Sequence, residues 1–524
     1  MLDLTARRSP AELFRVSVSV AIVLAVTLAA SQLTSPYVPV DELLGDLWVE
    51  TDAIWRASLG QVPGRDFITP LGPLFYGVYR LLTLIEPPSL AVMVHGNLVV
   101  GLAAALLAFG ISRRLTSPEV VVLLMLLAFL TAASGRAIGT PLAAQAVPYI
   151  VPYNRWAWAI AIPCAFGLLM GHRGGGRLPS MLIGLGLAAL FYIKLSYFAG
   201  LCVLAGGALL IEAHSRTDRR AAVRRALALS VAAALFLGLG ALLAGPSSYL
   251  ADVKMIAAAN YVTFRLVKFA IQTVEAGLTF GLGLVIYQLA SNFKPPAWQD
   301  MARIFLMVGA GAAIMSQNHE NNEAPLYFAA LLLAYALGDS RAERSPESPA
   351  APATRRAAFY LTLLVLLVPM TADAGTAAIA RLRVAANPRP VLEEFRNTPL
   401  ADLRSGDRRE IAVINDGLAL LDRIGQSGRT VLPFTMGNPL SALTGTRSPR
   451  GSMAIWYYGR TFSEDHLPSA DRALGDAEIL MIRKQDQTSE WLWRLYEPAI
   501  RSRYRPAGES SHWVAWQRSP APLG

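Results

Sequence analysis

Long apolar segments recur along most of this 524-residue chain, and they restrict its fold more than any other feature. A helix needs about 20 apolar residues to cross the hydrocarbon core of a bilayer. On that criterion about eleven spans are expected, near residues 14–32, 90–111, 118–135, 155–171, 179–194, 196–212, 226–244, 269–290, 302–316, 324–338 and 358–376. The sequence therefore predicts a mainly α fold, a polytopic transmembrane helix bundle.

Composition supports a membrane protein over a set of soluble domains. Hydrophobic residues make up 54% of the chain and charged residues only 16%. The net charge of +10 comes from short arginine runs between apolar spans, a pattern typical of orientation signals, so no nucleic-acid partner is expected. The chain also contains no GxxxxGK[ST], HExxH or GxSxG motif, which argues against several ATP-driven and hydrolytic functions.

The basic runs predict the orientation of the spans. When the spans are threaded in order, these runs all fall on the side of the N-terminus: 113–114, 173–177, 216–225, 294–303 and 341–356. Because Lys and Arg are enriched in cytoplasmic loops, the N-terminus is expected inside and the C-terminus outside. All the later basic runs fall on the inner side only if 179–194 and 196–212 are two helices, although Lys194 and Ser196 are the only visible turn between them.

Two domains are expected. Residues 1–376 would form the bundle, with a first extracytoplasmic loop at 33–89, and residues 377–524 a small extracytoplasmic, periplasmic α/β domain. Its expected strands and helices follow from local apolar patterns. The strands are 409–416 (REIAVIND), 428–434, 477–484 and 511–518, and the helices are 416–426 and 489–504.

The first loop gathers six acids beside aromatic residues, and we expect it to rest at the bilayer surface, where it could meet a lipid-borne substrate. The acids are Asp41, Glu42, Asp46, Glu50, Asp52 and Asp66. Asp46 is the first candidate for a catalytic base that removes a proton from an acceptor; the alternative is an acid that caps or solvates an interfacial helix. The adjacent Asp41 and Glu42 could exchange roles with Asp46. Glu50 and Asp52 are expected to be solvated.

Asp66 is the second catalytic candidate. It lies in the turn GRDF, where it could act as a metal ligand, as a brace of the first loop, or simply as a turn residue. A divalent cation held by carboxylate oxygens is possible as a cofactor, whereas the sequence offers no zinc ligand set.

Further substrate-binding candidates lie next to other spans. Lys194 is an ionisable residue within FYIKLSYF and could meet a phosphate, or extend to the lipid headgroups. Arg155 begins a span and could donate a bidentate pair of hydrogen bonds to a phosphate, or anchor in the headgroups. His319 and Glu320, in the short outer loop QNHENNE, are expected to bind the sugar or the phosphate.

The first loop resembles that of the GT-C glycosyltransferases, which include the protein O-mannosyltransferases and the lipid A aminoarabinose transferases. The resemblance covers about 40 residues and combines an acid, a Gly, a Pro, an Arg-Asp-Phe turn, and a Gly-Pro with a following aromatic residue. Those positions are Asp46, Gly60, Pro63, Arg65, Asp66, Phe67, Gly72, Pro73 and Tyr76. Family members often carry an Asp-Glu pair at the catalytic position, whereas Leu47 follows Asp46 here, so the choice between Asp46 and Asp41 stays open.

The resemblance implies a bacterial inner-membrane enzyme that moves a hexosyl or pentosyl group from a polyprenyl-phosphate donor to an envelope glycan, lipid or protein. It implies Asp46 as the base, an inverting displacement, and Arg155, Lys194 and His319 as stabilisers of the leaving phosphate. The main competing hypothesis is a transporter or flippase of lipid-linked glycans, which would place charges near the middle of the helices. A polymerase or ligase of similar topology, or a structural scaffold, would also be compatible with many spans.

Overall fold

The structure is a computed structural model. It describes residues 10–40, 45–116, 118–134, 152–171, 176–214, 219–244, 246–260, 297–316, 371–386, 393–394, 400–425 and 428–520, with isolated positions between 266 and 288.

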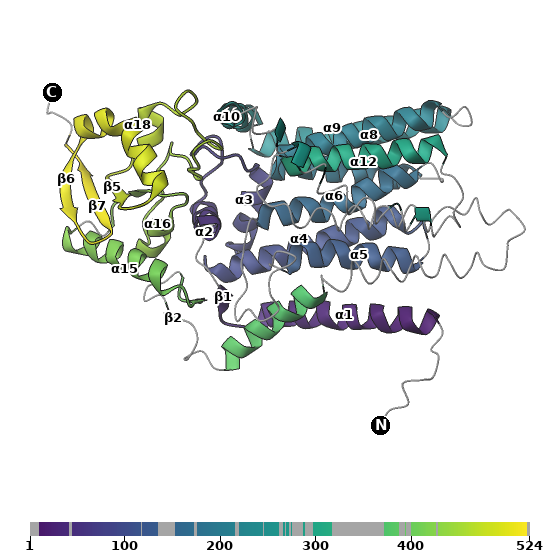
Figure 1. The fold of residues 1–524 in the computed structure, drawn as a ribbon, viewed down its shortest axis with the longest axis horizontal. Coiled ribbons are helices and arrows are strands. Elements are labelled where there is room, and N and C mark those ends of the chain that lie inside the picture. The colour runs from purple at the N-terminus through teal and green to yellow at the C-terminus, as the bar shows by residue number, and fades with distance from the viewer. Residues whose placement is uncertain are drawn as a thin grey trace, which may run out of the picture.

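A bundle of long apolar helices forms one half of the molecule (Figure 1). Its helices are α1 Pro10–Thr34, α4 Leu90–Ser112, α5 Pro118–Ala133, α6 Pro152–Met170, α7 Arg177–Ile193, α8 Leu195–His214, α9 Arg219–Ala244 and α12 Trp298–Ser316. Among the described residues, three helices are long and apolar enough to cross a membrane: α4, α8 and most of α9. The expected mainly α fold is confirmed. The expected span 324–338 lies outside the described residues, as does most of 269–290.

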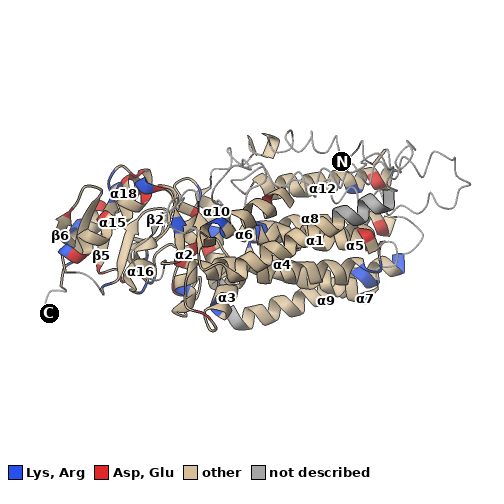
Figure 2. Cartoon of the chain, turned by 90° about the horizontal axis from the view of Figure 1, so that it is seen from below, with Lys and Arg blue, Asp and Glu red and all other residues tan. Residues whose placement is uncertain are grey.

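In the described helices of this bundle, charged residues avoid the middle and gather at the two ends (Figure 2). The end away from the C-terminal domain carries Arg113, Arg177 and the arginines at the start of α9. The predicted pair of helices is confirmed, because α7 ends at Ile193, Lys194 is extended, and α8 begins at Leu195.

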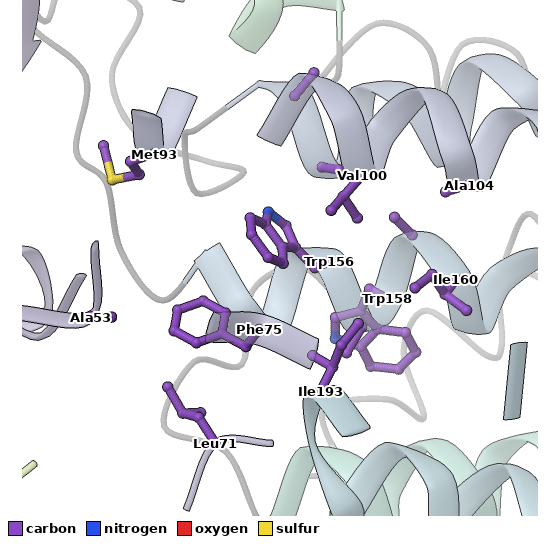
Figure 3. Close-up of a cluster of buried hydrophobic side chains, with 14 of the residues drawn as sticks. Ala53, Leu71, Phe75, Met93, Val100, Ala104, Trp156, Trp158, Ile160 and Ile193 are labelled. Carbon is purple, nitrogen blue, oxygen red and sulfur yellow. The ribbon is translucent and has the colours of Figure 1, made fainter. Parts of the chain in front are cut away.

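The first loop folds into two helices between the bundle and the C-terminal domain (Figure 1). These are α2 Gly45–Ser58 and α3 Pro73–Leu82, and the short helix α10 Pro246–Ala259 lies at the same level. α3 is fixed by aromatic packing: the Phe75 ring lies 5.1 Å from that of Tyr79 and 5.3 Å from that of Trp156. Figure 3 shows Phe75 and Trp156 in this cluster, which joins the first loop to α6.

The C-terminal domain is built on a four-stranded sheet with strand order β4-β5-β7-β6. The strands are β4 Val431–Phe434, β5 Ile479–Arg483, β6 Tyr504–Glu509 and β7 Trp513–Arg518. β4 and β5 are parallel, and the other pairs are antiparallel. The helices are α15 Arg408–Arg423, α16 Pro439–Thr444, α17 Ala470–Leu474 and α18 Gln487–Arg503. Before this domain, residues 371–386 are helical, so a helix continues past the expected boundary at 377.

One strand prediction in this domain is wrong. The segment 409–416 lies within α15 instead of forming a strand, because Ile411, Ile414, Leu418 and Leu421 line one buried helical face. The Asp407 side chain caps this helix by accepting a hydrogen bond from the Glu410 N–H at 3.1 Å. The strand β6 was not expected, since it contains a proline and a glycine and is interrupted between Pro506 and Gly508; such residues occur in edge strands and at bulges.

A second small sheet ties the end of the first helix to the C-terminal domain. β1 Val38–Val40 pairs in parallel with β3 Leu403–Ser405, and β2 Glu393–Glu394 is antiparallel to β3. Beside it, the Asp402 carboxylate accepts hydrogen bonds from the first backbone N–H groups of α4, at 2.8 Å from Ala91 and 3.4 Å from Leu90. The C-terminal domain therefore caps a helix of the bundle.

A fully buried arginine network connects α2 to the same domain. Arg56 and Asp52 form an ion pair at 2.6 Å with almost no exposed surface. Arg56 also donates to Gln61 Oε1, to the Pro449 carbonyl at 3.0 Å and to Ser452, and Ser448 donates to Asp52 at 2.7 Å. The expectation that Asp52 is solvated is wrong, because the C-terminal domain covers it.

Arg56→Ala should destabilise the junction between α2 and the C-terminal domain by about 3–5 kcal/mol, because it leaves the buried Asp52 carboxylate without its charge partner. The matched control is Arg501→Ala, whose pair with Glu497 has the same spacing but is 60% and 39% exposed; it should cost about 1 kcal/mol or less. Thermal unfolding in detergent, followed by tryptophan fluorescence, measures the difference. Equal losses of stability in the two variants would contradict the prediction.

Candidate functional site

Asp46 lies in the first turn of α2, at the end of the bundle that faces the C-terminal domain. Its carboxyl is partly buried, and this burial raises its pKa to about 6, while the positive charge of Lys194 opposes the rise. The two groups therefore lie within electrostatic reach of each other. Near neutral pH most of Asp46 is ionised, yet its proton affinity exceeds that of an ordinary aspartate, which suits a general base.

Lys194 occupies the break between α7 and α8. Its ammonium donates a hydrogen bond to Asn154 Oδ1 at 2.6 Å and lies 4.7 Å from the centre of the Tyr153 ring. The first loop approaches this break closely, since the Gly72 N–H donates to the Ile193 carbonyl at 2.9 Å. A β-carbon at position 72 would collide with the Tyr192 carbonyl, so only glycine allows this contact.

Arg155 follows Asn154 in the first turn of α6 and is buried. Its Nη1 donates to the Ser134 hydroxyl at 3.0 Å. The start of α6 thus supplies both the amide that holds Lys194 and a second cation. Two of the predicted substrate-binding residues, Arg155 and Lys194, therefore lie at the same end of the bundle, and Asp46 of α2 lies within electrostatic reach of Lys194.

Glu50 is a residue that the sequence analysis missed, and the expectation that it is solvated is wrong. It lies one turn beyond Asp46 in α2 and has no exposed surface. Its Oε2 accepts a hydrogen bond from the Tyr79 hydroxyl at 2.6 Å. Burial raises the pKa of Glu50 to about 8; the Tyr79 hydrogen bond opposes this rise and the charge of Asp46 adds to it. The spacing of four residues between the two acids was the available signal.

Asp66 lies in the loop between α2 and α3, next to the C-terminal domain. Its carboxylate accepts from the Val62 N–H at 2.8 Å and from Arg65 at 2.9 Å, and Arg450 lies 4.0 Å away. Although burial raises its pKa, the hydrogen bonds from Arg65 and Val62 and the charge of Arg450 lower it below the ordinary value. These contacts hold the loop in shape. They lower the pKa of Asp66, whereas burial raises that of Asp46.

Four predicted site residues, Asp41, Glu42, His319 and Glu320, lie outside the described residues. Within the described ranges, no group of three or more His, Cys, Asp or Glu side chains is arranged to hold a metal ion. Asp46 and Glu50 lie one turn apart on α2, and the charge of Lys194 acts on Asp46.

A small apolar groove lies between α6, α8 and α12, and its empty space is about 320 Å³ when the adjoining open solvent is included. Its lining includes Trp158, Ala161, Ala165, Leu204, Ala310 and Gly311. Trp158 lies one turn beyond Asn154 in α6, and its ring packs edge-on against Tyr197, which follows Lys194 by three residues. The groove therefore begins close to Lys194 and continues into the bundle.

Comparison with known proteins gives structural neighbours only. No protein-family model matches the chain, and no curated protein matches it significantly. The fold is similar to that of ArnT from Cupriavidus metallidurans bound to undecaprenyl phosphate, with 11% identity, a TM-score of 0.47, and coverage of 97% of this chain and 98% of that chain. The apo ArnT structure gives 11% identity, a TM-score of 0.41, and coverage of 98% and 99%.

ArnT is a lipid A aminoarabinose transferase of the GT-C group, the group that the first-loop motif resembles. At this identity and these TM-scores, neither structure assigns a role to any residue of this chain.

Lys194→Met should raise the pKa of Asp46 above about 6, because the ammonium charge favours the ionised carboxylate. Infrared titration of the Asp46 carboxyl, identified by its loss in Asp46→Asn, measures this change. The matched control is Lys254→Met, which removes an exposed lysine of α10 and should leave the titration in place. An Asp46 pKa that is equal in both variants would show that Lys194 does not act on it.

Proposed function

We propose that the protein is an integral-membrane glycosyltransferase that moves a hexosyl or pentosyl group from a polyprenyl-phosphate donor to an envelope glycan, lipid or protein. The transfer takes place at the end of the bundle covered by the C-terminal domain, on the periplasmic side of the bacterial inner membrane. The observation that carries this proposal is that Asp46, a partly buried acid of α2, and Lys194, at the break between α7 and α8, lie at that end within electrostatic reach of each other. They supply a base of raised proton affinity and a cation that can meet a phosphate.

The chemistry follows from these two groups. An acceptor hydroxyl or amine attacks the anomeric carbon, the bond from that carbon to the phosphate oxygen breaks, and the electron pair leaves with the phosphate. Asp46 takes the proton of the attacking group. Lys194 and Arg155 stabilise the negative charge that develops on the phosphate. Attack opposite the leaving group inverts the anomeric configuration.

The apolar groove supports a lipid-borne donor. A phosphate near Lys194 would place the attached prenyl chain at the start of the groove between α6, α8 and α12, which is lined by small and apolar side chains. Burial of an isoprenoid chain in such a groove is favourable, because each buried CH₂ contributes about 0.8 kcal/mol. A cation at the membrane surface with an apolar groove beneath it fits an amphipathic lipid phosphate.

The distribution of charge favours an enzyme over a transporter. In the described helices of the bundle, charged side chains lie at the ends, and the middle of the bundle is uncharged (Figure 2). A transporter of lipid-linked glycans is expected to place polar or charged groups along its path near the bilayer centre.

Asp46→Asn should lower kcat for sugar transfer by about 10²- to 10⁴-fold, because the amide cannot accept the acceptor proton. Donor binding should change little. The wild-type rate should fall as the pH drops below about 6, since protonation removes the base. Transfer of labelled sugar from polyprenyl-phosphate donors to envelope glycans by purified protein measures both effects.

Asp465→Asn, which removes an exposed carboxylate of the C-terminal domain, is the control and should transfer normally. Loss of transfer in Asp41→Asn alone, with Asp46→Asn active, would move the base to Asp41. If labelled lipid-linked glycan crosses proteoliposomes while no donor is consumed, the protein is a transporter instead.

Ala310→Phe should raise KM for a long-chain donor and leave a short, water-soluble donor analogue almost unaffected, because the ring fills the groove. Ala313→Phe is the matched control, since Ala313 lies on the same helix but is exposed on the outer surface. Kinetics with the two donors separate the effects. An equal loss with both donors would show that the groove does not hold the lipid chain.

A further inference from the structure

The Glu50 carboxyl has an incomplete set of partners. Its Oε2 accepts from Tyr79, whereas its Oε1 is buried and has no hydrogen-bond partner among the described residues. No cation forms an ion pair with it in the described part of the chain. A fully buried carboxylate held by one neutral hydrogen bond is strongly disfavoured.

A neutral carboxylic acid fits the same position. Because Tyr79 donates to Oε2, the acid proton belongs on Oε1, where it becomes a hydrogen-bond donor that needs an acceptor. Asp46 lies one helical turn away on the same side of α2, and its negative charge acts on Glu50. Asp52 is nearer to Glu50 in sequence, but it lies on another side of the helix and is paired with Arg56.

We propose that Asp46 and Glu50 form a carboxyl pair that holds a single proton, kept on Glu50, and that Glu50 is a positioning residue for Asp46. Oε1 of Glu50 donates to one oxygen of Asp46 and leaves the other oxygen free for the proton of the attacking group. The pair therefore carries one negative charge, which Lys194 balances. This role rests on the proposed function, whereas the sharing of one proton does not.

In the described parts of α2, α3, α4 and α16, the charged groups other than Asp46 have partners of their own. Besides Asp46, α2 carries the Asp52–Arg56 pair, which is neutral as a unit. α3 contributes the hydroxyls of Tyr79 and Tyr76. Its cation, Arg80, donates to the Ala57 and Ser58 carbonyls at the end of α2. In α4 the imidazole of His95 is engaged with Glu86. α16, which also packs against α2, has no titratable side chain.

Ionisation of Glu50 should disable the site. Above a pH of about 8, a second negative charge appears beside Asp46, where it draws Lys194 away and repels a donor phosphate. Transfer by the wild type should therefore decline above that pH. In Glu50→Gln the neutral amide can still donate, so this decline should disappear, and transfer near pH 7 should fall only a few-fold. Glu50→Ala removes the donor and should lower kcat by about 10- to 100-fold, with little change in KM.

Difference infrared spectroscopy on the purified full chain is the decisive experiment, because it needs no substrate. Wild-type protein near pH 7 should show a protonated carboxyl band that Glu50→Gln lacks and that disappears above a pH of about 8. In Asp46→Asn the band should persist but titrate at lower pH, since the neighbouring charge is gone. The control Glu464→Gln, at an exposed ion pair, should keep the wild-type band.

Absence of the Glu50 band near pH 7, or an unchanged titration in Asp46→Asn, would overturn the shared proton. If the band behaves as expected but sugar transfer by Glu50→Gln still declines at alkaline pH, the positioning role of Glu50 is overturned. If neither the wild type nor any variant transfers sugar while the Glu50 carboxyl band behaves as expected, the proposed function fails and the carboxyl pair stands.

Discussion

The buried Arg56 guanidinium is the interaction on which the arrangement of the site depends. Removing such a charge from water is costly, so its donors must all find acceptors. Asp52 supplies one from the same helix, and the segment 448–452 of the C-terminal domain supplies others. A helix held in this way cannot rotate about its own axis without breaking several charge-assisted hydrogen bonds. The C-terminal domain therefore sets the direction in which α2 presents its other faces.

The orientation of α2 decides which acids reach the bundle. With about 100° between successive residues, Asp46 and Glu50 share one side of α2, and Asp52 and Arg56 share another. The second side contacts the C-terminal domain, and the first faces Tyr79 and Lys194. One short helix thus gives its acids two different settings. Asp52 forms an ion pair with Arg56 of the same helix. Asp46 and Glu50 have no such partner on α2, and only the charge of Lys194, on another element, acts on Asp46. Burial raises the pKa values of the Asp46 and Glu50 carboxyls, and the charge of Lys194 opposes this rise only in part at Asp46.

The sequence predicted those parts of the molecule that depend on local or one-dimensional signals. Apolar runs located α1 and α4 to α9, and short apolar patterns located β4, β5, β7 and α18. The motif around Asp46 identified the first loop as the place to look. The burial of Asp52 was not predictable in this way, because it depends on a domain that begins more than 300 residues later. The burial of Glu50 depends on tertiary packing too, since its partner Tyr79 lies on another helix. Strand β3, only three residues long, is likewise specified by its pairing with β1 and not by its own pattern.

The short break at Lys194 explains why a Gly-Pro pair belongs in the first loop. A helix interruption beside a membrane exposes backbone groups that need partners. Here the Lys194 N–H donates to the Leu190 carbonyl, and the Lys194 carbonyl accepts from the Tyr197 N–H. The Ile193 carbonyl is satisfied by Gly72, whose lack of a side chain permits the approach.

Pro73 then starts α3 at a position where no N–H is needed. The same contact that completes the backbone of α7 fixes the start of α3, the helix that carries Tyr79. Tyr79 in turn binds Glu50, which lies one turn from Asp46 on α2. The hydrogen bond from Gly72 to Ile193 therefore connects the break at Lys194 to the helix that carries Asp46.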